Sequence, residues 1–159
     1  MNKKIKKGKY DVLTISNYVL KYSKQKGYFI NITKLMKLLY FIQAKELVEN
    51  NKKCFNEKIL AWEFGPAIYE VFEKYKLMFG LNGILTNDDE SIDKKTKKII
   101  ESIVEKYSDK DAMDLTNQTH SSGPWKQYWE IDKNSIKNEI PVEEIKKFYS
   151  SDKGIKEIE

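Results

Sequence analysis

The chain has 159 residues with one histidine and one cysteine, which fits a single globular domain. No apolar run reaches the ~20 residues of a membrane-spanning helix, and no apolar signal-type segment follows the basic start. Because a lone cysteine cannot form an internal disulfide, we expect a cytoplasmic protein without membrane contact.

The net charge of +5 is concentrated at the start of the chain. Five positive charges occur there without an acid, on Lys3, Lys4, Lys6, Lys7 and Lys9. Every basic residue is lysine, which lacks the forked guanidinium that reads guanine or clamps phosphate. Residues 1–9 are therefore predicted to be a basic flexible tail. This tail is either solvated or in weak contact with nucleic acid or an acidic partner.

Helical patterns fill most of the first half of the chain. The first helix is predicted to start at Asp11, a good N-cap residue, and to end before Gly27. The second is predicted to begin at Asn31 or Thr33 and to run to about Asn50. Its apolar residues cover most of the helix circumference, which indicates burial by neighbours on several sides. We expect this helix to be the centre of the fold.

The rest of the chain alternates short helices with turns. An extended aromatic segment from Ile59 to Phe64 is expected to end at Gly65-Pro66, where proline opens a third helix. Later helices are predicted over about 92–107 and after Asp111, Pro124 and Pro141, with residues 119–123 as a loop. No strand pair is predicted. The fold class is mainly all-α: one compact bundle of about six or seven helices over residues 10–150, followed by a frayed end at 151–159.

Candidates for metal binding and catalysis are few. One histidine and one cysteine do not make a tetrahedral zinc site, and the acidic run Asp88-Asp89-Glu90 has no histidine or glycine-rich partner. Cys54 lies in a lysine-rich turn and would pair with His120 only if their two loops met; a semi-exposed, inert cysteine is the simpler reading. No phosphate-binding glycine loop is present. We therefore expect no enzyme activity, no metal and no cofactor.

Two segments combine a large aromatic residue with a Gly-Pro step. One is Trp62-Glu63-Phe64-Gly65-Pro66, and the other runs from His120 to Gly123-Pro124-Trp125. Both tryptophans fit core anchors, or one ring face is left exposed as a binding hot spot for a partner. His120 has three readings: it bonds a backbone carbonyl and holds its loop, it contacts a partner, or it acts as an acid or base.

Together these segments resemble the Panacea domain, the family of SocA-like antitoxins and phage-associated GepA-like proteins. The first match is KLMKLLYFIQ at residues 34–43 and the second is AWEFGPA at residues 61–67, followed by Tyr69 and Tyr75. The third match comprises Leu115, Thr119, His120, Pro124 and Trp125. Order and spacing agree over about residues 12–149. Ala67, where the family usually has valine, is a minor departure.

The resemblance implies an antitoxin of a toxin–antitoxin system that neutralises a toxin by direct binding. It also implies a variant of this role, a proteolytic adaptor that delivers the toxin to a cellular protease. The residues expected at the family signature or partner surface are Tyr40, Trp62, Phe64, Gly65, Pro66, Tyr69, His120, Pro124 and Trp125. The alternative hypothesis is a phage- or plasmid-associated nucleic-acid-binding protein that uses the lysines from Lys3 to Lys9.

Overall fold

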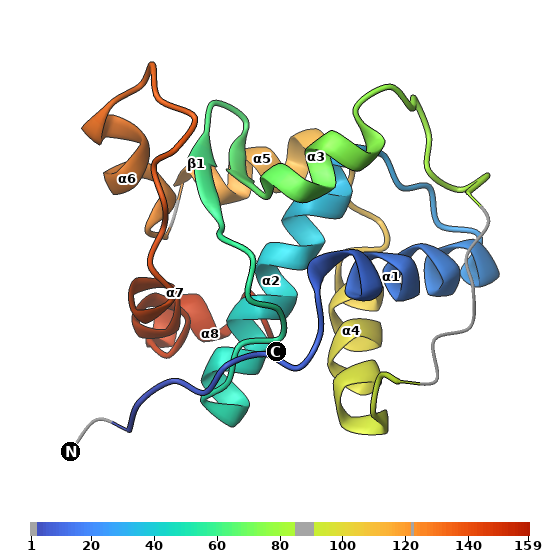
Figure 1. Ribbon diagram of the computed structural model, residues 1–159, viewed down its shortest axis with the longest axis horizontal. Coiled ribbons are helices and arrows are strands. Elements are labelled where there is room, and N and C mark those ends of the chain that lie inside the picture. Colours follow the sequence, from blue (N-terminus) through green and yellow to red (C-terminus); the bar gives the residue numbers. More distant parts are fainter. Residues whose placement is uncertain (1–2, 85–90, 122) are drawn as a thin grey trace.

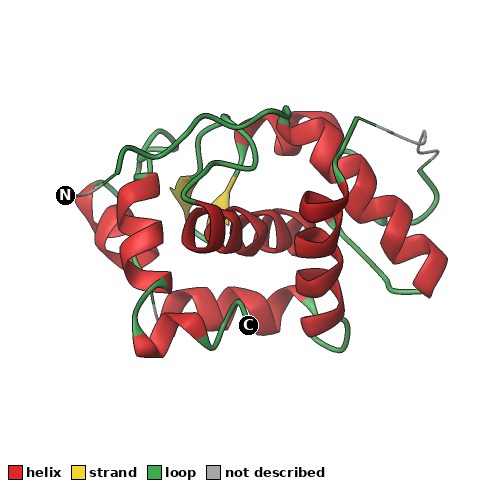
Figure 2. Cartoon of the chain, turned by 90° about the horizontal axis from the view of Figure 1, so that it is seen from below, coloured by secondary structure: helices red, strands yellow, loops and turns green. Residues whose placement is uncertain are grey.

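The computed structural model describes residues 3–84, 91–121 and 123–159. Its elements are α1 (Val12–Lys26), α2 (Ile32–Asn50), β1 (Leu60–Trp62), β2 (Gly65–Ala67), α3 (Tyr69–Tyr75), α4 (Lys94–Lys106), α5 (Ala112–Ser121), α6 (Trp125–Ile131), α7 (Val142–Tyr149) and α8 (Asp152–Ile155). Helices dominate, and the two short strands occupy one small region (Figure 2). The mainly all-α fold class is confirmed. No helix in the described part of the chain has the length and apolar character needed to cross a membrane.

Helix α2 is the centre of the fold, as predicted. It packs against α1 and α4 on one side and α7 on the other, while β2, α3 and α5 cover its first half (Figure 1). Between Lys34 and Leu47 nearly every side chain is buried. A helix enclosed in this way needs apolar residues around its whole circumference, which explains the lack of a polar stripe.

The core between α2, α4 and α7 is built from stacked and edge-on aromatic rings. Phe41 stacks on Tyr107 with ring centroids 4.7 Å apart, and Tyr40 meets Tyr149 edge-on at 5.7 Å. Offset and edge-to-face pairs are the favourable arrangements for aromatic rings. Tyr40, one of the expected signature residues, is thus a fully buried core residue.

The predicted starts of the first two helices are confirmed by their caps. The Asp11 carboxylate accepts a hydrogen bond from the Thr14 amide at 2.8 Å, and the Asn31 side chain does the same for Lys34. Such bonds satisfy amides that have no partner inside the helix. Gly27 follows α1 with φ 76°, the left-handed conformation that glycine adopts without strain.

The segment around Gly65-Pro66 departs from the prediction. Instead of opening a helix, Gly65-Pro66-Ala67 forms strand β2, which pairs antiparallel with β1 in the register Trp62↔Gly65 and Leu60↔Ala67. Helix α3 begins only at Tyr69. With φ 103°, Gly65 is incompatible with a helix start, and the distant residue Ile140 donates its amide to the carbonyl of Ile59 just before β1.

Helix α5 is longer than predicted. Residues 119–121 were expected in a loop, but they form its last turn, so Thr119 and His120 lie on the same helix as Thr116. The start of α5 is fixed by a reciprocal pair: the Asp114 amide donates to the Asp111 carboxylate, and the Asp111 amide donates to Asp114. Such a capping box favours a helix start at this point.

Both ends of the chain make contacts that the sequence did not predict. Where a flexible tail was expected, residues 3–10 run beside residues 51–56, and the Lys6 amide donates to the Asn51 carbonyl at 3.0 Å. Where a frayed end was expected, helix α8 forms and Ile158 is buried. The Lys45 ammonium donates to the Ile158 carbonyl at 2.8 Å.

Candidate functional site

Side chains of two helices, α2 and α5, bind the backbone of the β1–β2 hairpin. From α2, the Lys37 ammonium donates a hydrogen bond to the Pro66 carbonyl at 3.1 Å. From α5, the Thr116 hydroxyl donates to the Phe64 carbonyl at 3.2 Å. Both bonds reach backbone oxygens of the hairpin, so its position depends on side chains of the central helix and of α5.

Gly65 lies where the hairpin comes closest to these helices. A Cβ atom at this position would lie 2.7 Å from Cε of Lys37 and 2.8 Å from Oγ1 of Thr119. Both distances are shorter than van der Waals contact, so the end of the Lys37 side chain occupies space that only glycine leaves free. Glycine is therefore required here for its positive φ and for its missing side chain.

The two aromatic segments that the sequence singled out meet at this hairpin. The Trp125 indole N–H donates to the Trp62 carbonyl at 2.7 Å, and the His120 ring stacks on Trp125 with centroids 3.9 Å apart. Trp62 in turn donates its indole N–H to the Ile136 carbonyl at 2.9 Å and meets Phe72 edge-on. Trp125 is buried and Trp62 is half-buried, so Trp125 is a core anchor and Trp62 keeps part of its ring accessible.

The surroundings of His120 in this cluster disfavour the charged form of its ring. Burial lowers the pKa of its imidazole, the positive charge of Lys37 lowers it further, and the backbone of Glu63 opposes both effects. Its Nε2 atom is buried and has no hydrogen-bond partner among the described residues. An imidazole that is stacked on indole suits a packing role.

Lys37 is a functional candidate that sequence reasoning did not single out. It is 1% exposed, and burial lowers the pKa of its ammonium to about 7. Removing an ammonium from water disfavours the charged form, and a nearby acid would reverse that shift. The signal in the sequence was a lysine inside the apolar run Leu35-Met36-Lys37-Leu38, on a helix expected to be buried on all sides.

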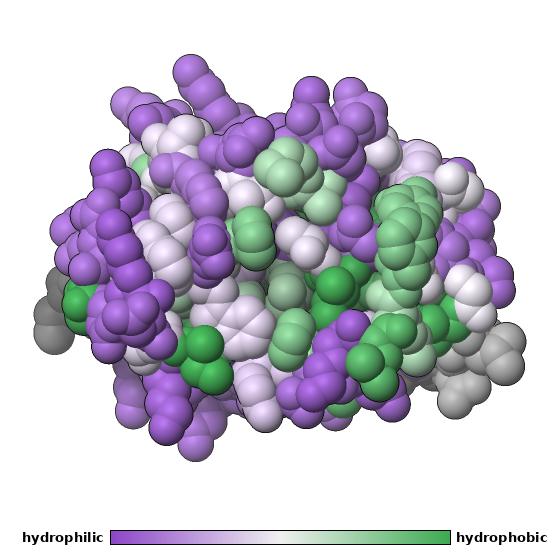
Figure 3. Space-filling view, turned by 90° about the horizontal axis from the view of Figure 1, so that it is seen from above, coloured by the Kyte–Doolittle hydropathy of each residue, from purple (hydrophilic) through white to green (hydrophobic). Residues whose placement is uncertain are grey.

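A small cleft lies beside the hairpin, and Lys37 is one of the residues that line it. Its volume is about 120 Å³, and it is lined by Ile32, Thr33, Met36, Lys37, Trp62, Phe64, Gly65, Ala67 and Phe72. Phe64 stands at its border with 61% of its side chain exposed. The upper face, seen in Figure 3, carries several apolar areas separated by polar ones. We call the cleft with Trp62 and Phe64 the hairpin surface.

Residues 35–126 match the family model described as Antitoxin SocA-like, Panacea domain. The chain belongs to this family. The matched range begins in α2 and ends in α6, so it contains Lys37, the hairpin, His120 and Trp125. No curated protein and no solved structure gives a match.

The Panacea domain brings six of the nine expected site residues together. Trp62, Gly65, Pro66, His120 and Trp125 form the packed base of the hairpin, and Phe64 forms its exposed edge. The other three lie apart from this cluster or next to it. Tyr40 is in the core, Tyr69 is half exposed at the start of α3, and Pro124 is buried at the N-cap of α6.

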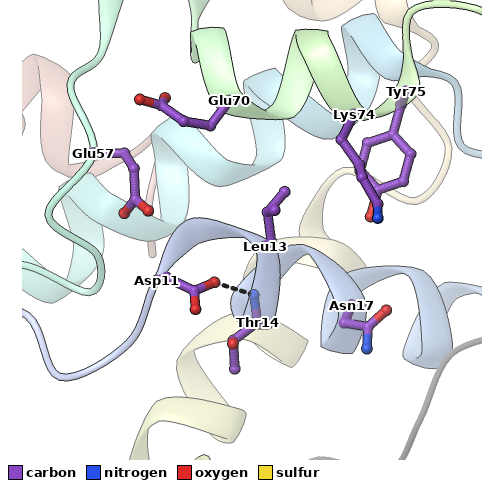
Figure 4. Close-up of a pocket in the computed structure, with 8 residues that line it drawn as sticks. All are labelled: Asp11, Leu13, Thr14, Asn17, Glu57, Glu70, Lys74 and Tyr75. Carbon is purple, nitrogen blue, oxygen red and sulfur yellow. Dashed lines mark hydrogen bonds between the residues drawn. The ribbon is translucent and has the colours of Figure 1, made fainter.

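A second hollow, of about 440 Å³, lies between α1 and α3 (Figure 4). Asp11, Glu57 and Glu70 give it an acidic lining, and Lys74 faces it from α3. Two of these acids accept hydrogen bonds from amides at the start of α1: Asp11 accepts from the Thr14 amide, and Glu57 accepts from the Val12 amide at 3.1 Å. These carboxylates are explained by the helix start that they stabilise.

The catalytic candidates do not come together. Cys54 is buried rather than semi-exposed, and burial raises the pKa of its thiol. The Cys54 amide donates to the side chain of Gln43, so Cys54 lies beside that part of α2. His120 lies near Lys37, because the charge of Lys37 acts on it. Since Lys37 and Gln43 are six residues apart on α2, about 9 Å along its axis, Cys54 and His120 lie beside different parts of this helix.

Within the described ranges no group of three or more potential ligands could hold a metal ion. Asp88, Asp89 and Glu90 lie outside those ranges.

Proposed function

We propose that this protein is an antitoxin that neutralises a partner toxin by direct protein binding through the hairpin surface. Membership of the antitoxin SocA-like family supports the role. The observation that carries the choice of surface is Phe64, an exposed aromatic residue at the border of an apolar cleft on a hairpin pinned by Lys37 and Thr116. We propose further that the protein acts in the cytoplasm and without catalysis.

The hairpin surface has the physical properties of a binding hot spot. Aromatic anchors beside well-packed pockets dominate the affinity of many interfaces. Because hydrogen bonds from two helices already fix the backbone of the hairpin, little conformational entropy is lost when a partner binds. The half-buried ring of Trp62 adds apolar area next to Phe64.

Co-expression with the product of the adjacent gene tests the antitoxin role. The neighbour should arrest growth when expressed alone, and growth should recover when this protein is present and bound to it. A toxin that persists in the complex indicates occlusion, whereas a toxin that disappears in a protease-dependent manner indicates a proteolytic adaptor. A harmless neighbour, or one that stays toxic and unbound, contradicts the proposal.

Replacing Phe64 by alanine is expected to weaken toxin binding at least tenfold, because the exposed ring supplies buried apolar contact in the complex. The fold should be unaffected, since the ring makes little contact with the core. The matched control is Phe79→Ala, which removes another exposed phenylalanine, 93% accessible, that does not border the cleft. Calorimetric titration measures both affinities. Equal losses for the two variants would place the interface elsewhere.

Contact with nucleic acid through the lysines near the start of the chain is a second candidate function. Lys3, Lys4, Lys6, Lys7 and Lys9 are all exposed. Replacing Lys3, Lys4, Lys7 and Lys9 by glutamine should lower the slope of log K against log salt by about 3 to 4 on duplex DNA. The control replaces four lysines of α4, namely Lys94, Lys95, Lys97 and Lys98. A slope that is the same in both variants would exclude this mode of binding.

A further inference from the structure

The Lys37 amino group is buried, and within the described ranges it has no counter-ion. Burial is the sole cause of its lowered pKa, so no carboxylate in the described part of the chain acts on it. Among the described residues, the Pro66 carbonyl is the one acceptor that its three N–H donors meet. Buried ionisable groups in proteins are normally paired with an opposite charge, and the described part of the chain offers none to Lys37.

Lys34 is a second buried lysine on the same helix, and it has acidic residues nearby. It lies one turn before Lys37, and its ammonium donates to the Lys110 carbonyl at 2.6 Å. Burial lowers the pKa of Lys34, and three acids partly offset this effect: Asp109 and Asp111 before α5, and Asp114 in its first turn. Acids therefore lie near one buried lysine of α2 and not near the other. The lack of an acidic partner is specific to the site of Lys37.

The apolar cleft of the hairpin surface leads to Lys37. Its walls are mostly carbon, from side chains such as Ile32, Met36 and Phe72. Among the described residues that line it, Lys37 is the single charged one. An apolar cavity of about 150 Å³ is large enough for benzene. At about 120 Å³, this cleft suits a shorter group, such as two or three carbons with a carboxylate.

We propose that the cleft receives a carboxylate on a short apolar stem, and that in the toxin complex this group is an aspartate or glutamate side chain of the toxin. The second part rests on the proposed antitoxin function. Desolvating ions is costly, but folding has already buried Lys37, so only the incoming carboxylate still has to lose its water when the two groups meet. The apolar walls exclude water and strengthen the attraction.

Propionate is a suitable probe, because it reproduces the end of a glutamate side chain. We expect it to shift the backbone amide signal of Gly65 and the indole signal of Trp62 in the NMR spectrum of the full chain, saturating in the millimolar range. Propionamide, which has the same shape without the charge, should bind at least tenfold more weakly. Sodium chloride at equal ionic strength should cause no such shifts.

Two variants separate the site from general attraction to lysines. Lys37→Met should abolish the saturable shifts, while Lys34→Met, which removes the neighbouring buried lysine, should retain them. Equal binding of propionate and propionamide would overturn the carboxylate site. So would unchanged binding by Lys37→Met, or propionate shifts spread over surface lysines alone.

The toxin complex tests the second part of the proposal. Lys37→Met should weaken toxin binding at least tenfold, and Lys34→Met should not. If propionate binds at Lys37 but toxin affinity is unchanged in Lys37→Met, the site exists and the toxin does not use it. If the neighbour gene product does not bind at all, the antitoxin function fails while the propionate result still stands.

Discussion

Replacing Gly65 by alanine is expected to lower the free energy of unfolding by about 3 kcal/mol. Two effects add. The backbone has φ 103°, which costs an L-residue on the order of 1 to 2 kcal/mol, and the new Cβ would lie 2.7 Å from Cε of Lys37 and 2.8 Å from Oγ1 of Thr119. Lys37 and Thr119 are both buried, so neither can move aside without losing a contact. Urea unfolding followed by circular dichroism measures the loss.

Gly27→Ala separates the two effects. Gly27 also has a positive φ, 76°, but a Cβ there would have no atom within 4 Å. This variant should therefore lose only the backbone part, about 1 to 2 kcal/mol. A loss at Gly65 no greater than the loss at Gly27 would show that the space beneath the hairpin is not tightly filled by Lys37.

Local signals in the sequence were sufficient for the central part of the fold. Asp11 and Asn31 start helices because their side chains accept hydrogen bonds from amides three residues later, and such caps depend only on neighbours in sequence. The all-round apolar pattern of α2 likewise predicted a buried central helix, because the pattern reflects how many sides are covered.

The hairpin could not be predicted from local signals. Proline at the start of a helix and proline in a short strand look alike in sequence, and the choice here depends on distant residues. The Ile140 amide binds the Ile59 carbonyl, the Ala61 amide binds the Asn138 carbonyl, and the Lys37 ammonium binds the Pro66 carbonyl. These long-range hydrogen bonds favour strand geometry over residues 60–67. The amino-acid sequence of that segment alone does not indicate them.

The candidate site was predicted in part for a similar reason. Large aromatic residues at Gly-Pro steps drew attention to Trp62 and Trp125, which do meet at one place. Lys37 was not singled out, because the apolar pattern of the helix predicts burial of the helix as a whole and does not show how deeply one lysine within it is buried. Its depth of burial depends on Gly65 being close above it, a contact between residues 28 positions apart.

Lys37→Met is expected to stabilise the protein at pH 7 and below by about 3 kcal/mol. Burial lowers the pKa of Lys37 to about 7 in the folded state, whereas an exposed lysine has a pKa near 10.5. Each pKa unit corresponds to about 1.4 kcal/mol, so the folded state bears a cost of several kcal/mol wherever the lysine is charged in both states. Methionine fills similar volume without charge, and loss of the hydrogen bond to Pro66 offsets about 1 kcal/mol of the gain.

The sign of the pH dependence follows from proton binding. Between the folded pKa of about 7 and the unfolded value near 10.5, the unfolded state holds more protons at Lys37, so the free energy of unfolding rises with pH in the wild type. The advantage of Lys37→Met is therefore complete below about pH 7 and shrinks by up to about 1.4 kcal/mol per unit above it. Cys54, whose pKa is raised by burial, acts in the opposite direction but equally in both proteins, so their difference isolates Lys37.

Urea unfolding of both proteins at several pH values between about 6 and about 9 measures this difference. Lys34→Met is the matched control, because burial also lowers the pKa of Lys34 but nearby acids partly offset that effect, so its removal should stabilise the protein less than Lys37→Met does. A constant difference between wild type and Lys37→Met across the range would mean that Lys37 is charged throughout when folded. If Lys37 is uncharged or half-charged in the free folded protein, the difference should depend on pH. A bound carboxylate would then raise the pKa of Lys37, so that the amine takes up a proton from the solvent.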